Sequence, residues 1–219
     1  MGLHTRPVQI VDLSHHYADD MPLYPGLPSP SFHDFAQVER DGYAMSEYHL
    51  LNHIGTHVDL PSHQVAGGAT LDDIPLESFV TDAVTVDLSG RDPGAIGWEE
   101  LEPLVADLRT GDWLFLYSAN GRNWGSDDYW TGWSYPDAEA TRGIVERGAV
   151  GVGFDGPSAD PVDTETFELH KVWLSAGRMI LENLTNLDLL QARTEIVVAP
   201  LKVRAANGAP ARVLAFVPD

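Results

Sequence analysis

The chain of 219 residues contains no cysteine. Disulfide bonds and thiolate metal ligands are therefore excluded. Any bound metal must be held by histidine and carboxylate groups, a ligand set that suits zinc, manganese or iron(II).

Basic residues are scarce as well. Only two lysines occur, Lys171 and Lys202, and 13 basic residues stand against 33 acidic ones, which gives a formal net charge of −20. Such a surface repels nucleic acid and anionic lipid, so we expect neither as a partner. Two explanations of the acidic excess stay open. It is either a plain coat of solvated carboxylates or an adaptation to a cytoplasm of high ionic strength, where salt screens self-repulsion.

Long apolar runs are also missing. No run approaches the roughly 18 residues that a membrane-spanning helix needs, and residues 1–7 lack the apolar core of a signal peptide. We therefore expect a cytoplasmic protein. A hydrophobic content of 43% over this length suffices for one sizeable core, so we expect a single domain spanning 1–219, with two small domains as the alternative.

The most informative segment present is HIGTHVDLPSH at residues 53–63. It contains three histidines and one aspartate, side chains that zinc, manganese and iron prefer. In an extended strand these alternate positions would face one side. Residues four apart on a flat strand lie about 13 Å apart, however, so the chain must curl between His53 and His57 for both rings to reach one ion. Gly55 permits this curl and leaves room beside the ion, and Pro61 directs the chain toward His63.

Patterns along the rest of the chain indicate mixed α/β structure. Strands are expected at residues 8–13, 43–51, 83–88, 112–117 and 149–154, and a closing hairpin at 194–203 and 211–217 around Asn207-Gly208. Helices are expected at residues 96–108, 136–147 and 164–176, the last capped by Thr164. The aromatic-rich stretch 118–135 fits no regular element and is either a self-packed surface loop or part of a pocket wall.

Two further residues stand out against their surroundings. His170 lies on the expected helix 164–176, where a histidine is more often packed in a core than bound to metal. Glu182 follows the apolar residues 179–181, where a buried carboxylate is costly unless it is paired or metal-bound.

The motif at residues 53–63 resembles the signature of the metal-dependent cyclase-type hydrolases, which include bacterial kynurenine formamidases and isatin hydrolases. The similarity continues over most of the chain, in VDLS at 11–14, PLYPG at 22–26, GVGFD at 151–155, PSAD at 157–160 and ILENL at 180–184. The resemblance implies an α/β fold of the swivelling β/β/α type. It also implies assembly as a homodimer or homotetramer whose neighbours can complete the pocket.

The resemblance further implies a metal-ligand set of five residues, His53, His57, Asp59, His170 and Glu182. We expect two divalent ions that share the carboxylate of Asp59. Zinc is the expected metal, and manganese is the alternative. Such ions would supply hydroxide from water near neutral pH. His63 is expected to act as the acid/base that passes a proton to the departing amine.

The expected reaction is hydrolysis of a carbon–nitrogen bond in a small amide. The resemblance points to aryl formamides such as N-formylkynurenine, an arylformamidase step of tryptophan catabolism. Tyr24 is expected to line the substrate pocket, at a position where kynurenine formamidases carry tryptophan. Cyclic amides of the isatin type are the alternative substrates, although isatin hydrolases carry an amide-type residue where Glu182 lies. A non-catalytic metal-binding protein is the alternative of another class, and it leaves the extra histidine His63 unexplained.

Overall fold

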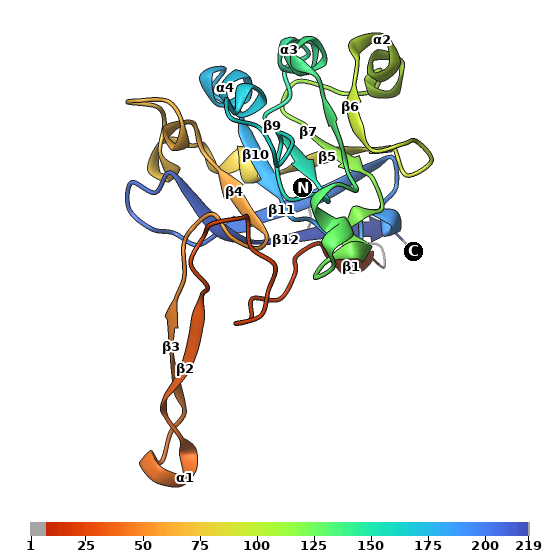
Figure 1. The fold of residues 1–219 in the computed structure, drawn as a ribbon. Helices are drawn as coiled ribbons and strands as arrows, with labels where there is room; N and C mark the ends of the chain where they lie inside the picture. The colour runs from red at the N-terminus through yellow and green to blue at the C-terminus, as the bar shows by residue number, and fades with distance from the viewer. Residues whose placement is uncertain (1–7, 219) are drawn as a thin grey trace.

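A mixed β-sheet that curls into a closed barrel forms the centre of the computed structural model, which describes residues 8–218 (Figure 1). Around the barrel the strands follow the order β12 (Gly208–Pro218), β11 (Arg193–Pro200), β5 (Val80–Asp87), β7 (Trp113–Tyr117), β9 (Gly151–Phe154), β10 (Met179–Glu182) and β4 (His57–Asp59). β4 pairs with β12 as well as with β10, which closes the ring. β1 (Val8–Asp12) extends the sheet beside β12. The segment 1–7, which entered the expectation of a cytoplasmic protein, lies outside the described residues.

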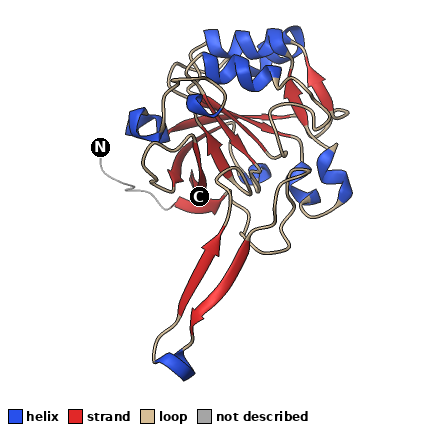
Figure 2. Ribbon diagram, turned by 60° about the vertical axis from the view of Figure 1, so that its left-hand side comes forward, coloured by secondary structure: helices blue, strands red, loops and turns tan. Residues whose placement is uncertain are grey.

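Two hydrophobic cores lie on the two faces of this sheet. On β7, Trp113 and Phe115 point into the barrel, whereas Leu114 and Leu116 point to the outer face. The sequence of this strand is therefore apolar throughout, because both of its faces are buried. The helices α2 (Trp98–Leu101), α3 (Ala138–Glu146) and α4 (Glu168–Ser175) cover the outer face and lie together on one side of the barrel (Figure 2).

Shorter elements complete the described chain. The 3₁₀ turns are η1 (Pro61–His63), η2 (Leu71–Asp73), η3 (Leu76–Phe79), η4 (Glu102–Val105), η5 (Asn120–Asn123), η6 (Asp127–Trp130) and η7 (Leu187–Leu189). β6 (Gly94–Ile96) pairs with β8 (Ser134–Pro136) in parallel. β2 (Ser31–Ala36), α1 (Val38–Asp41) and β3 (Met45–His49) form an arm that projects away from the barrel (Figure 1). Within residues 8–218 no helix has the length and apolarity to cross a membrane.

The expected mixed α/β class is confirmed, and each expected strand overlaps an observed one. The closing hairpin is also confirmed: β11 and β12 pair antiparallel, with Pro200 opposite Ala211. The expected strand 43–51 is shorter in the structure. β3 ends at His49 and pairs only with β2, so it lies in the arm.

All three expected helices begin later than the sequence indicated. Residues 96–108 do not form one helix. Ile96 ends β6, and α2 ends at Leu101. The 3₁₀ turn η4 follows from Glu102 and contains Pro103, which has no N–H to donate. Leu104, inside the expected helix, is 47% exposed. The second helix, α3, begins at Ala138 instead of Pro136, because the side chain of Asp137 accepts the N–H of Ala140 and caps it.

The helix expected at 164–176 is also shorter. α4 begins at Glu168, and Thr164 is not its cap. The hydroxyl of Thr164 accepts the N–H groups of Thr166 and Phe167 before the helix starts. The N–H groups of the first turn of α4 are instead accepted by a carboxylate from the preceding loop, Asp160.

Candidate metal centre

The strand pair β4–β10 presents three chemically active side chains on the outer face of the barrel. Val58 and Leu181 belong to the core inside the barrel. Since successive side chains on a strand point to opposite faces, their neighbours His57, Asp59 and Glu182 point outward. Glu182 lies directly opposite His57 in the register, and α4 packs against β10 at this place. These three buried polar side chains and His170 of α4 therefore meet between sheet and helix.

The chain curls before β4, as the sequence predicted. Gly55 adopts φ +57°, and regular strand structure begins only at His57. A Cβ at Gly55 would lie 2.8 Å from both Tyr17 and Met21. A side chain at position 55 would therefore collide with Tyr17 and Met21, which gives a second reason for a glycine here. Gly55 also lines the pocket above the site, and the expectation that it leaves room beside an ion stays a prediction. The curl places the ring of His53 beside Asp59, with Nδ1 2.5 Å from Oδ1.

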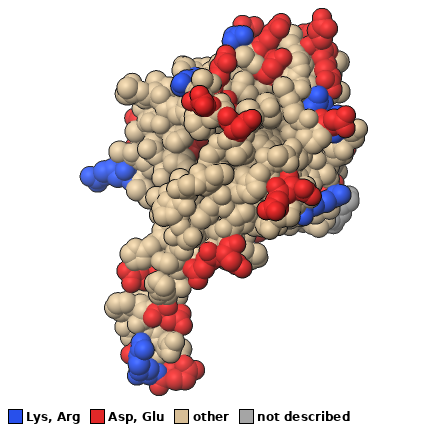
Figure 3. Space-filling view, viewed as in Figure 1, with Lys and Arg blue, Asp and Glu red and all other residues tan. Residues whose placement is uncertain are grey.

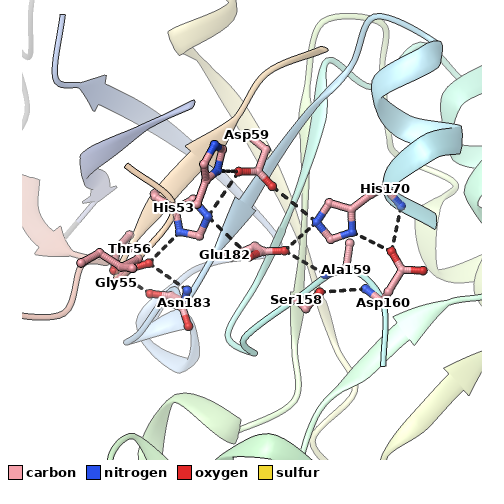
Figure 4. A network of polar contacts seen from close by, with 12 residues as sticks. His53, Gly55, Thr56, Asp59, Ser158, Ala159, Asp160, His170, Glu182 and Asn183 are labelled. Atoms are coloured by element: carbon pink, nitrogen blue, oxygen red, sulfur yellow. Dashed lines mark hydrogen bonds and ion pairs between the residues drawn. The ribbon is translucent and has the colours of Figure 1, made fainter. Parts of the chain in front are cut away.

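Two groups of potential metal ligands result, and they share Asp59 (Figure 4). The first comprises His53, His57 and Asp59, and the second comprises Asp59, His170 and Glu182. Within each group the ligand atoms lie within 4.8 Å of one another. His57 Nε2 is 3.2 Å from Asp59 Oδ1, and His170 Nε2 is 3.4 Å from Asp59 Oδ2 and 3.1 Å from Glu182 Oε1. The structure thus brings together all five residues that were expected to hold metal.

Asp160 orients the imidazole of His170. One carboxylate oxygen accepts the N–H of Leu169, and the other accepts both the backbone N–H and the Nδ1–H of His170, the latter at 2.6 Å. With Nδ1 engaged in this way, Nε2 faces Asp59 and Glu182 (Figure 4). A carboxylate behind a ligating histidine is a common support of metal sites. Asp160 was not among the site residues expected from the sequence, although it lies in the PSAD segment that carried the resemblance.

Asn183 fixes the curled segment against β10. Its amide donates to the carbonyl of Gly55, its backbone carbonyl accepts the hydroxyl of Thr56, and its Oδ1 accepts the hydroxyl of Tyr129. The carbonyl of Gly55 also accepts Nδ1–H of His57 at 2.8 Å, which leaves Nε2 of that ring facing the carboxylates. The backbone of Asn183 is left-handed, with φ +59°. Sequence reasoning missed this residue as well.

Burial and charge shift the pKa values of the central groups. Burial alone would lower the pKa of His57, but the carboxylates of Asp59 and Glu182 outweigh it and raise that pKa to about 9. At His170 burial also acts to lower the pKa, but Asp160, Asp59 and Glu182 raise it well above its ordinary value. At Asp59 burial acts to raise the pKa, but the surrounding histidines outweigh it and hold the pKa well below its usual range.

The donor set fits divalent metal ions. Asp59 and Glu182 are 1% and 6% exposed, and a buried carboxylate needs a compensating cation. Among the described residues no arginine or lysine forms an ion pair with either carboxylate. The histidines whose pKa values are raised supply that charge in their protonated form. Imidazole and carboxylate groups at this spacing can equally supply ligands to zinc or manganese.

A pocket of about 240 Å³ opens over these groups. His63 lines it, with its ring stacked on His53 at a centroid distance of 3.9 Å, and burial lowers the pKa of His63. Tyr24 lines the pocket too, and its hydroxyl donates to the carbonyl of Val162. From the aromatic stretch 118–135, Trp130 reaches the pocket wall, whereas Tyr129 is fully buried. The stretch is thus part of a pocket wall and not only a surface loop.

A closed barrel with two buried histidine–carboxylate groups at the floor of a pocket defines a candidate metalloprotein. The chain belongs to the Cyclase family, whose model matches residues 11–161. It is similar to a kynurenine formamidase of Salinibacter ruber, with 29% identity over 219 residues that cover 96% of this chain and 99% of that protein.

Solved structures agree with this assignment. An isatin hydrolase bound to the product analogue thioisatinate superposes with a TM-score of 0.89 over 97% of this chain and 93% of that chain, at 20% identity, and shows the shared fold. A structure described as a potential metal-dependent hydrolase with cyclase activity reaches a TM-score of 0.81 at 28% identity, over 97% of this chain and 100% of that chain.

Proposed function

We propose that this chain is a metal-dependent hydrolase that cleaves the carbon–nitrogen bond of a small amide. The observation that carries the proposal is the pair of ligand groups that share Asp59, with a further imidazole, His63, in the pocket beside them. Membership of the Cyclase family supports the same reaction class, because similar members carry the names of hydrolases.

Two divalent ions are part of the proposal. Zinc is the metal that we propose, and manganese is the alternative. His53, His57 and Asp59 would hold one ion, and Asp59, His170 and Glu182 the other. Such ions, when bound, lower the pKa of water toward neutrality and polarise a carbonyl group. Asp160 and the carbonyl of Gly55 hold the rings of His170 and His57 so that Nε2 of each faces the carboxylates.

His63 has the properties of a proton carrier. The part of the chain that the structure describes offers its ring nitrogens no hydrogen-bond partner, and its lowered pKa favours the neutral form, which can accept a proton near neutral pH. It is therefore the residue that we propose to take up a proton and deliver it to the leaving amine. Its position on η1, directly after β4, holds it over the ligand groups without making it a member of either.

The leading substrate in the proposal is an aryl formamide such as N-formylkynurenine, as in tryptophan catabolism. The aromatic side chains of Tyr24, Trp130 and Phe167 line the pocket and can pack against the planar ring of a substrate. The polar ligand groups line the same pocket. The similarity to a kynurenine formamidase over nearly the whole chain supports this choice. The swivelling β/β/α architecture, the single domain over 1–219, the cytoplasmic location and a homodimer or homotetramer belong to the same proposal.

A cyclic amide of the isatin type is the second candidate substrate. The fold shared with an isatin hydrolase favours it. The carboxylate of Glu182 favours the first candidate, because isatin hydrolases carry an amide-type residue there and a second ion needs the carboxylate.

The test is a hydrolysis screen with protein reconstituted with zinc or manganese, using N-formylkynurenine, formanilides, isatin and small cyclic amides. We expect turnover of the aryl formamides, two ions per chain by elemental analysis, and loss of turnover after chelation with recovery on adding the metal back. Protein that binds no transition metal even after reconstitution would contradict the metal centre. Protein that loads two ions but hydrolyses none of these amides would be the non-catalytic metal-binding protein instead.

A further inference from the structure

The connection between β11 and β12 ends beside the first group of potential metal ligands, at the ring of His53. Its last residue is Asn207, whose backbone carbonyl accepts the N–H of Leu60 at 3.0 Å. The next residue, Gly208, begins β12 and lies opposite Asp59 in the register with β4. The strand pairing that closes the barrel therefore also places the side chain of Asn207 at the edge of the metal centre.

Gly208 allows the ring of His53 to lie against this strand. A Cβ at position 208 would collide with Cε1 of His53, and it would lie 2.9 Å from Nδ1 of that ring and 2.8 Å from the carbonyl oxygen of Val58. Any side chain at position 208 would therefore displace either the ring or the neighbouring strand. Only glycine permits this close approach of ring and backbone.

His53 is the potential ligand with the least support from regular structure. It lies in the bend formed by residues 52–56, ahead of β4, whereas the other four potential ligands lie on β4, α4 and β10. Its side chain is 20% exposed, against 3% for His57 and 5% for His170. The orientation of this ring therefore depends on side-chain contacts more than that of the other two histidines.

The hydrogen bonds around Asn207 fix the direction of each polar group. The amide of Asn52 donates to the carbonyl of Gly208 at 3.1 Å and to Oδ1 of Asn207 at 2.6 Å. Because Asn52 is the donor, the atom of Asn207 that faces it is the amide oxygen. The same oxygen lies 3.0 Å from Nε2 of His53, so Nε2 carries a hydrogen and donates it. In neutral His53 the nitrogen without hydrogen is then Nδ1, which faces Asp59 (Figure 4).

Asn207 differs from the acceptors that hold the other two ligand histidines. His170 donates to the carboxylate of Asp160, and His57 donates to a backbone carbonyl. Asn207 instead offers a neutral amide oxygen on an exposed side chain. A charged acceptor holds an N–H more strongly than a neutral one does. The support of His53 can therefore be weakened or strengthened by a change at position 207 that does not open the core.

We propose that Asn207 is the positioning residue of His53 and sets the affinity of the first ligand group for its ion. It holds the ring through Nε2–H and leaves the lone pair of Nδ1 for the metal, as outer partners of metal-binding histidines do. No hydrogen bond within residues 8–218 joins Asn207 to the second ligand group. The inference rests on the metal centre of the proposed function and extends it, because one of the two ions then depends on Asn207 and the other does not.

Zinc titration of the metal-free full chain, in competition with a chelator, measures the affinity of each ion without substrate. Asn207→Leu removes the acceptor and should weaken one ion about tenfold and leave the other nearly unchanged. Asn207→Asp keeps an acceptor, so it should hold that ion at least as tightly as the natural chain does. Gln37→Leu is the matched control, because Gln37 is also exposed and its amide donates to Asp34 in the arm.

Combined variants separate positioning through His53 from a general structural role. Asn207→Leu should have no further effect in a chain that already carries His53→Ala. In a chain that carries His170→Ala it should still weaken the remaining ion by the same factor.

Three outcomes would overturn the inference while the metal centre stands: equal weakening of both ions, an effect that persists beside His53→Ala, or affinities in Asn207→Leu that match those of Gln37→Leu. A natural chain that binds no zinc would instead contradict the proposed function, and the inference with it.

Discussion

His57 and His170 become potential ligands through their second ring nitrogens. In each ring Nδ1–H donates, to the Gly55 carbonyl in one case and to Asp160 in the other, so that Nε2 is left to face the shared carboxylates. This orientation is fixed by tertiary contacts. Sequence spacing could therefore predict which residue types gather, but not which nitrogen faces the centre.

His63 is expected to act on protons and not on the metal. His63→Ala should reduce turnover of an aryl formamide about 10²–10⁴-fold and leave the number of bound ions per chain nearly unchanged, because His63 belongs to neither ligand group. Steady-state kinetics and elemental analysis of the same preparation measure both quantities. Loss of metal together with activity would make His63 a ligand and end the acid/base assignment.

Asp160 is expected to set metal affinity through His170. Asp160→Asn removes the charge that holds Nδ1–H of that ring, so the affinity for metal should fall about 10–100-fold. Competition with a chelator measures it. Asp137→Asn is the matched control, because Asp137 also accepts an N–H at the start of a helix, α3, but touches none of the site residues. Equal affinities in the two variants would show that Asp160 only caps α4.

At the scale of elements, the strands could be predicted and the helix starts could not. β7 and β9 are apolar throughout because both faces are buried, a pattern visible in the sequence. The start of α4 depends on Asp160, which lies eight residues before Glu168 and reaches the helix only after the loop has folded. Asn183 escaped notice for the same reason, since its contacts join it to residues more than 50 positions away.

Asp155 links β9 to the pocket wall and should make stability depend on pH. Its carboxylate accepts the N–H groups of Ser118 and Asn120, yet burial dominates and raises the pKa of Asp155 from 3.8 to about 6. An acid whose pKa is raised by folding stabilises the protein at low pH. That stability is lost as the pH rises from the unfolded value to the folded one, by about 3 kcal/mol in total.

Asp155→Asn isolates this effect. The difference in unfolding free energy between the natural chain and the variant should shrink by about 1 kcal/mol from pH 5 to pH 7. This range spans the upper part of that window and stays above the isoelectric point of about 4.5. Urea unfolding in one chelator-containing buffer series measures it. The subtraction removes the contributions of the other titrating groups. A difference that stays constant over this range would mean that Asp155 has an ordinary pKa.

At the scale of the whole molecule, the barrel closure and the charge distribution dominate. Closure depends on the pairing of β4 with β12, which sets Asp59 opposite Gly208, and a pairing over that separation leaves no local signal in the sequence. Acidic side chains are spread over the helices and the arm (Figure 3). Exposed carboxylates such as Glu99, Asp107 and Glu146 form no ion pair within the described residues, so their repulsion is relieved only by salt.

Stability should therefore rise with ionic strength. With a net charge of −20, carboxylate repulsion weakens the folded state in dilute buffer, and molar potassium chloride shortens the screening length from about 10 Å at 0.1 M to about 3 Å. Metal ions should recover part of the low-salt loss, because they bind the folded state preferentially. Thermal unfolding of metal-free and metal-loaded protein across this range measures both effects. A variant with Glu99→Gln, Asp107→Asn and Glu146→Gln should respond less to salt. If the unfolding temperatures of the metal-free and the metal-loaded protein do not change with salt, adaptation to high ionic strength is excluded. The acidic surface is then only a layer of solvated carboxylates.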